Sequence, residues 1–106
     1  MHVVDLAAAR RFSPEKMQKV ALFETERMFC DVYCFEPGQT QKAHAHPGSD
    51  KVYVVLEGRG RVRVGDAEQS LGPMQATTAP PGADHAVVND GPGRLVLLVF
   101  MAPRPA

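Results

Sequence analysis

The sequence predicts an all-β domain that folds as a small barrel or a jelly-roll-like sandwich. Short stretches rich in β-branched and aromatic residues recur at intervals of about ten residues, which is typical of sandwiches and barrels. Glycine and proline, nine of each, separate these stretches and supply the turns between strands. A chain of 106 residues suits one compact domain with one hydrophobic core, so we expect a single domain over residues 1–106.

The N-terminal part of the chain carries the only helical signals. Asp5 can cap a short helix over residues 6–12, and Ser13-Pro14 marks either a second helix start or a turn. Further along, Pro80-Pro81-Gly82 must be a loop, because a helix cannot accommodate this run.

Strand signals dominate the rest of the sequence and define the expected domain. We expect a barrel core over approximately residues 20–101, an N-terminal extension at 1–19 and a frayed tail at 103–106. The predicted strands are 20–23, 28–35, 51–57, 61–64, 67–71, 86–89 and 95–101.

Composition and charge exclude several classes of protein. Apolar residues make up 44% of the chain, and twelve basic residues balance twelve acidic ones. No net positive charge attracts nucleic acid or an anionic membrane, so we expect neither as a partner. The longest apolar run, 95–102, is shorter than the roughly 20 residues that span a bilayer. The N-terminus lacks the pattern of a secretory signal, so we expect a cytoplasmic protein.

Two groups of residues carry the chemical signal. His44-Ala45-His46 is an i, i+2 pair, which on a strand directs both imidazoles to the same face. Five residues separate it from Gly38 on one side and from the apolar run 52–58 on the other. A second group, residues 80–89, reads Pro-x-Gly, two residues, His85, three residues, Asn89.

These two groups closely resemble the two sequence motifs of the cupin family. The resemblance covers residues 38–89, and the hairpin-like stretch 59–78 between the motifs fits as well. It implies a cupin barrel in which His44, His46 and His85 are the metal ligands. It also implies one divalent metal ion as cofactor, which could be iron, manganese, zinc or nickel.

Two positions depart from the cupin pattern. Met74 stands about where the family has a glycine before the second motif, which suggests a rearranged loop. Lys51 stands where the family has a glutamate ligand, and an ammonium group cannot ligate a cation. Asp50 could substitute only if the strand slipped by one residue, which would normally turn its side chain to the opposite face. We therefore favour a three-histidine site.

Further residues are candidates for the wall of the pocket. They are Lys51, Asp50, Tyr53, Cys34 and Asn89. With metal bound, we expect the Lys51 ammonium to point away from the ion. Without metal, it could point inward and occupy the vacant ligand position.

Two functional hypotheses remain open at this point. The first is a metal-dependent enzyme, a dioxygenase, isomerase or lyase that acts on a small oxygen-rich molecule, because three imidazoles leave open positions on the metal. The second is a non-enzymatic cupin that has lost its metal and binds a small molecule. Since residues 95–101 are apolar on both strand faces, we also expect a homodimer that covers an exposed face or edge.

Overall fold

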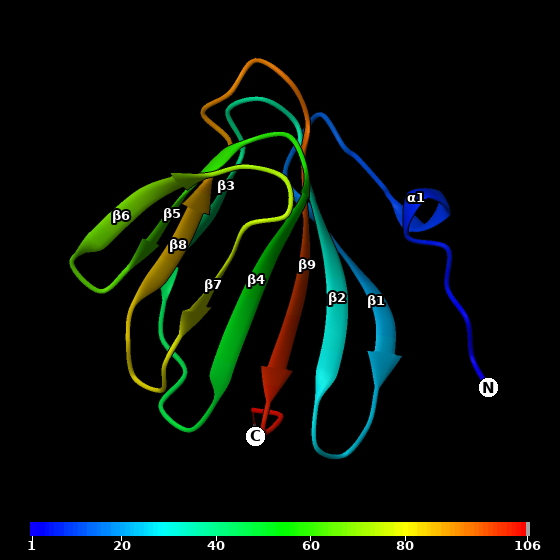
Figure 1. Ribbon diagram of the computed structural model, residues 1–106, viewed down its shortest axis with the longest axis vertical. Helices are drawn as coiled ribbons and strands as arrows, with labels where there is room; N and C mark the ends of the chain where they lie inside the picture. Colours follow the sequence, from blue (N-terminus) through cyan, green and yellow to red (C-terminus); the bar gives the residue numbers. More distant parts are fainter. Residues whose placement is uncertain (106) are drawn as a thin grey trace.

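The computed structural model describes residues 1–105 and is almost entirely β structure (Figure 1). Within this range, the only α-helix is too short to span a membrane. The elements are α1 (Leu6–Ala9), β1 (Gln18–Glu24), β2 (Phe29–Phe35), β3 (Thr40–His44), β4 (Asp50–Glu57), β5 (Gly60–Val64), β6 (Ala67–Leu71), β7 (Ala76–Ala79), β8 (His85–Val88) and β9 (Leu95–Ala102).

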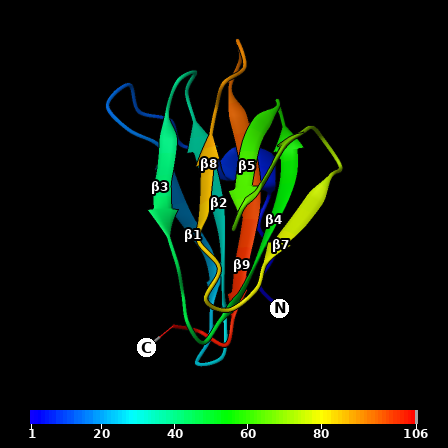
Figure 2. The same ribbon diagram turned by 90° about the vertical axis from the view of Figure 1, so that its left-hand side faces the viewer.

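The strands form two antiparallel sheets that face each other (Figures 1 and 2). The larger sheet has the order β1-β2-β9-β4-β7, and the smaller has the order β3-β8-β5-β6. Most neighbouring strands are distant in sequence, so long-range pairing builds both sheets. The predicted all-β, jelly-roll-like class is therefore confirmed.

The main core lies between the two sheets. On β4, Tyr53 and Val55 point inward and are fully buried, whereas Val52 and Val54 lie on the outer face and are half-buried. This alternation follows the period of two residues in a strand. The inner cluster contains Tyr33, Phe35, Tyr53, Val55, Val62, Leu71, Val87, Leu95, Leu97 and Val99.

The N-terminal extension covers part of the outer face of the larger sheet. Figure 1 shows α1 beside β1 and β2, and apolar side chains of this segment pack on a second cluster around Leu22 and Val96. Arg10 also reaches β4, where its guanidinium donates to Glu57 at 2.7 Å. The extension therefore covers apolar residues on the outer face of the sheet that would otherwise be exposed.

The helix in this extension is shorter than the sequence predicted. Asp5 caps it as expected, since its carboxylate accepts from the Ala7 amide at 3.0 Å. The helix nevertheless ends at Ala9, because Arg10 has an extended backbone. Phe12, which the prediction placed in the helix, instead packs on the second cluster under the guanidinium of Arg94.

Two strands were absent from the sequence prediction, β3 and β7. Each lies at the edge of its sheet and has only one neighbouring strand. Because edge strands expose most of their side chains, their sequences, TQKAH and ATTA, lack an apolar alternation that could reveal them. Only the pairing of β3 with β8 and of β7 with β4 defines them.

The turn before β7 has an unusual conformation at Met74. Its φ angle is 71°, in the left-handed region that favours glycine, and the amide of Gln75 donates to the Gly72 carbonyl at 3.1 Å. With Pro73 ahead of it, Met74 occupies the position where a type II turn needs a positive φ. This is the position where the cupin pattern predicted a glycine.

Candidate metal centre

Neighbouring strands bring two of the predicted histidines together. His44 is the last residue of β3 and His85 is the first of β8, and the two are partners in the strand register. A register shift between Gln41 and His44 marks an irregularity in β3 just before the first histidine.

His46 joins them by a different route from the one expected. It lies two residues beyond the end of β3, so simple strand alternation does not place it. Its carbonyl instead accepts a hydrogen bond from the Gly82 amide at 3.0 Å, which ties the loop after β3 to the loop before β8. As a result, one ligand nitrogen from each of the three histidines lies within 4.8 Å of the others.

Backbone carbonyls orient two of the imidazole rings. Nδ1 of His44 lies 2.9 Å from the Lys42 carbonyl oxygen, and Nδ1 of His85 lies 3.1 Å from that of Ala83. Because a carbonyl oxygen only accepts, each Nδ1 must carry the hydrogen and each Nε2 a lone pair. The two Nε2 atoms are only 3.2 Å apart. Two lone pairs facing each other at this distance are the arrangement that a shared cation stabilises.

Burial also keeps these imidazole rings neutral, which is the form that coordinates a metal ion. It lowers the pKa of His85 to about 4, and it is the main cause that lowers the pKa of His44 and His46 as well. The imidazoles are therefore neutral at neutral pH, which metal coordination requires. Three neutral nitrogen donors, two of them with N–H groups held by the backbone, could hold one divalent metal ion.

Lys51 points into the barrel and is almost fully buried. Its side chain is 1% exposed, and Nζ lies 5.2 Å from the ring centroid of Tyr53 and 5.3 Å from that of Tyr33. Within residues 1–105, its ammonium forms no ion pair. Burial, followed by repulsion from Lys19, lowers the pKa of Lys51 to about 7.

The other acidic candidate does not reach the barrel interior. Asp50 is exposed at the start of β4, and the alternation of this strand turns it away from the face that carries Lys51. The idea that Asp50 could replace the missing glutamate is therefore wrong, because the strand has not slipped.

Sequence similarity over these same strands assigns the family. Residues 31–101 match the family of the cupin domain. The protein belongs to the cupin family. Among solved structures, it is similar to TT1209 from Thermus thermophilus, with 50% identity, a TM-score of 0.96 and coverage of 99% of this chain and 100% of that one. An uncharacterized Klebsiella pneumoniae protein with a double-stranded β-helix domain shares the fold at 23% identity, with a TM-score of 0.90 and coverage of 97% and 90%.

A curated relative is the tetracenomycin polyketide synthase protein TcmJ from Streptomyces glaucescens. The two sequences are 38% identical over 72 residues, which cover 65% of this chain and 48% of TcmJ. The cupin chain thus spans about half the length of this relative.

Of the remaining pocket candidates, only Tyr53 faces the cupin interior. Its hydroxyl donates to Oε1 of Gln41 at 2.7 Å, and its ring centroid lies 6.1 Å from that of His85. Cys34 instead belongs to the cluster on the outer face of the larger sheet, where its sulfur accepts from the Arg11 amide at 3.4 Å. Cys34 was therefore wrongly placed in the pocket wall, since strand alternation opposes it to Tyr33.

Asn89 has a structural role and does not line the pocket. Its side chain is fully buried and donates to the carbonyl oxygens of Phe35 at 3.2 Å and Gly93 at 2.9 Å. Its own amide oxygen accepts from Gly91 at 3.2 Å. The assignment of Asn89 to the pocket is wrong, because these bonds direct it to the loop between β8 and β9.

Sequence reasoning missed Gln41, a buried residue on β3. It is 5% exposed, and its Nε2 has no hydrogen-bond partner within the described residues, 1–105. Its position three residues before His44 was the one hint that Gln41 could lie near the site. Its burial could not be predicted, because the sequence of β3 has no apolar alternation.

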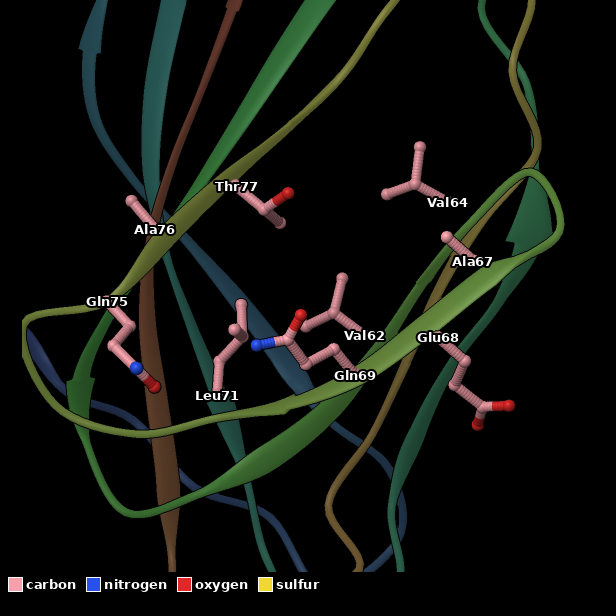
Figure 3. A pocket seen from close by; sticks show the side chains of 9 residues that line it. All are labelled: Val62, Val64, Ala67, Glu68, Gln69, Leu71, Gln75, Ala76 and Thr77. Carbon is pink, nitrogen blue, oxygen red and sulfur yellow. The ribbon is translucent and has the colours of Figure 1, made fainter.

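A cavity lies between the β5–β6 hairpin and β7 (Figure 3). Its volume is about 350 Å³. It lies close to the candidate metal centre, because Val64 pairs with His85 and Thr77 pairs with Tyr53. The lining residues are Val62, Val64, Ala67, Glu68, Gln69, Leu71, Gln75, Ala76 and Thr77.

Proposed function

We propose that this cupin binds one divalent metal ion through His44, His46 and His85 and is an enzyme that acts on a small, carbonyl-bearing molecule. The observation that carries the proposal is the pair of Nε2 atoms 3.2 Å apart. Both rings use their N–H groups on backbone carbonyls, so a cation between the lone pairs relieves their repulsion.

The donor set indicates what chemistry the site can support. When bound, an ion held by three neutral imidazoles keeps its full positive charge and open positions, so it can polarise a substrate oxygen. The protein itself holds two of the rings in place through backbone carbonyls, and the buried Tyr53 ring lies beside His85. Isomerase or lyase chemistry fits this arrangement, and dioxygenase chemistry is the alternative if the ion is iron.

The similarity to TcmJ supports a carbonyl-bearing substrate. TcmJ is named as a polyketide synthase protein. Polyketides carry several carbonyl groups, which are the groups that a Lewis acid polarises. We extend this substrate class to the present cupin as part of the proposal.

A second candidate function is small-molecule binding without a metal. It is favoured by Lys51, which points inward from the position of the missing glutamate ligand. A buried ammonium repels a divalent cation and would weaken its binding. The metal content of the purified protein separates the two functions.

The test is elemental analysis of untagged protein purified without added metal. We expect about one divalent ion per chain, and we expect His85→Ala to lose most of it while staying folded. His2→Ala is the matched control, because His2 is exposed at the N-terminus and packs edge-on against Phe23. Full metal retention in His85→Ala, or wild-type protein that binds no metal even when it is supplied, would contradict the proposal.

We further propose that two copies of the chain associate through the outer face of the larger sheet. Four half-buried side chains form an apolar surface there, which we call the outer patch, because Val52 pairs with Phe100 and Val54 with Leu98 across β4 and β9. A second copy could cover this surface.

A further inference from the structure

One buried hydrogen-bond donor in the barrel lacks an acceptor, and a lysine ammonium near the same tyrosine lacks a counter-ion. The Lys51 ammonium has no ion pair within residues 1–105, and its side chain is 1% exposed. Nε2 of Gln41 is also without a partner in a side chain that is 5% exposed. Buried polar groups are normally hydrogen-bonded and buried charges are normally paired, so the free Gln41 amide and the unpaired Lys51 ammonium together point to a missing anionic acceptor.

We propose that Lys51 and Gln41 bind a carboxylate group of the ligand inside the barrel. This inference rests on the proposed function, because it assumes that the ligand lies in the same barrel interior as the histidines. A carboxylate is the fitting occupant because it only accepts hydrogen bonds and carries the negative charge that an isolated ammonium lacks.

Tyr53 holds both donors in position. Its hydroxyl donates to Oε1 of Gln41 at 2.7 Å, which sets the amide orientation. The Gln41 side chain also interacts with the Tyr33 hydroxyl, but Nε2 has no partner at hydrogen-bond distance within residues 1–105. Its ring lies 5.2 Å from Nζ of Lys51, and the ring of Tyr33 lies 5.3 Å from it on β2. Cation–π contacts with two rings stabilise the ammonium in part, but they leave its three N–H donors available.

No acidic side chain within residues 1–105 forms an ion pair with Lys51. Asp31 shares the strand face of Tyr33 on β2 and influences Lys51, but the two form no ion pair. Burial raises the pKa of Asp31, whereas the charges of Lys19 and Lys51 lower it. Lys51 therefore has no acidic partner within residues 1–105, and an anionic ligand could supply one.

A basic groove borders Gln41 at the sheet edge opposite the cavity between the β5–β6 hairpin and β7. It lies between β1 and β3, the strands at one edge of the two sheets, and has a volume of about 510 Å³. Three lysines and no carboxylate line it, and Nζ of Lys19 lies 5.2 Å from the same Tyr33 ring that Lys51 contacts. The lining residues are Lys16, Met17, Gln18, Lys19, Thr40, Gln41 and Lys42. Such a surface attracts anions.

The position of Lys51 also suggests how a carboxylate and a metal would share the barrel. The Tyr53 ring contacts Lys51 on one side and lies 6.1 Å from the His85 ring. A divalent ion on the histidines and a nearby ammonium repel each other. A carboxylate bound between the two charges would remove this repulsion, so ligand and metal should strengthen each other's binding.

The test compares benzoate with benzamide, a neutral molecule of nearly the same shape. Calorimetric titration of EDTA-treated, full-length protein at constant ionic strength should show benzoate binding at least tenfold more tightly than benzamide. Lys51→Met should reduce benzoate affinity at least tenfold, and Gln41→Leu should reduce it severalfold. Arg63→Met is the control, because it removes an exposed cation outside the groove and should leave the affinity unchanged.

Equal affinity for benzoate and benzamide, or undiminished benzoate binding by Lys51→Met, would overturn the proposal. If Lys51→Met fails to fold, Lys51→Gln replaces it with the same expectation. His85→Ala separates this inference from the proposed metal site. Metal-free His85→Ala should still prefer benzoate to benzamide, even though it no longer retains metal.

Discussion

Lys51 places a positive charge on the inner face of β4, where the resemblance to cupins predicted a glutamate ligand. Its direction follows from strand alternation, since Tyr53 and Val55 on the same face are also buried. The expectation that metal turns the ammonium away from the site remains a prediction. The inward placement makes residue 51 the position at which the proposed metal site and the proposed ligand site would meet.

We predict that Lys51→Glu increases metal affinity at least tenfold. The substitution removes a repulsive charge and adds an anionic oxygen on the strand face that carries Lys51. Competition with a fluorescent chelator measures the affinity. Lys51→Gln, which removes the charge without adding a carboxylate, should give a smaller gain, and Lys42→Glu on the exposed side of β3 should give little. Unchanged affinity in Lys51→Glu would mean that residue 51 does not face the metal centre.

The low pKa of Lys51 predicts that stability rises with pH. Its pKa falls from 10.5 in the unfolded chain to about 7 in the fold, so only the unfolded chain holds the proton between these values. Stability is therefore lowest below pH 7 and increases above it. Denaturation of EDTA-treated protein at about pH 7 and 8.5 should show a gain of about 2 kcal/mol that Lys51→Met lacks.

Other titrating groups around Lys51 act outside this interval. The histidine pKa values are lowered, so their effect ends below pH 7. Burial raises the pKa of the two thiols and of the two neighbouring tyrosines, so these groups act above pH 8.5. A wild-type protein whose stability matches the pH dependence of Lys51→Met would show that the ammonium is solvated. The groups that titrate outside the interval between pH 7 and 8.5 are Cys30, Cys34, Tyr33, Tyr53, His44, His46 and His85. The charged neighbours that act on the pKa of Lys51 are Lys19 and Asp31.

Among the elements, the turn before β7 depends on a residue that is poorly suited to it. Met74 has a φ of 71° and is 91% exposed, so its side chain contributes little packing to offset the strain. The Met74 amide still donates to the Val55 carbonyl at 3.0 Å, which fastens the turn to β4. The turn thus retains the geometry for which the cupin pattern uses glycine.

We predict that Met74→Gly stabilises the protein by about 0.5–1 kcal/mol. Glycine adopts a positive φ without the clash of a Cβ, and this gain exceeds its larger entropy in the unfolded chain. Thermal denaturation measures the effect as a small rise in Tm. Met74→Ala is the matched control, because it removes the side chain but keeps the Cβ, and it should not stabilise. Equal effects of the two substitutions would place the cause in the side chain.

At the scale of the whole molecule, the N-terminal extension and the outer patch divide the outer face of the larger sheet. The extension packs on the side of β1 and β2, around Leu22 and Val32. The outer patch on β4 and β9 stays half-buried. The sequence argument for a homodimer assumed that a second copy would cover this sheet, whereas the chain covers much of it by itself.

We predict that the protein is a dimer at micromolar concentration and that Phe100→Glu makes it a monomer. A charge in the centre of an apolar interface cannot be paired, so it opposes association. Light scattering should give twice the monomer mass for the wild type. Phe23→Glu is the control, since Phe23 is an exposed aromatic on β1 outside the outer patch. A monomeric wild type would refute the dimer and leave the barrel unaffected.

The sequence by itself was enough to predict the fold class, the family and the grouping of the three histidines. Strands with a period of two residues and turns rich in glycine and proline predict an all-β fold locally, without knowledge of long-range contacts. The motifs around His44 and His85 are equally local, and the period of two residues within β4 places Tyr53 on the same face as Lys51. These properties depend on residues that are close together along the chain.

The tertiary structure alone decided which side chains reach the barrel interior and which groups they contact there. The edge strands β3 and β7 exist only through their pairing partners, so the inward turn of Gln41 could not be predicted. Cys34 and Asn89 found other partners because strand order and loop contacts, rather than sequence spacing, determine what each side chain meets. The unsatisfied Gln41 amide and the unpaired Lys51 ammonium arise only when the two sheets face each other, because burial is a property of the whole packed molecule.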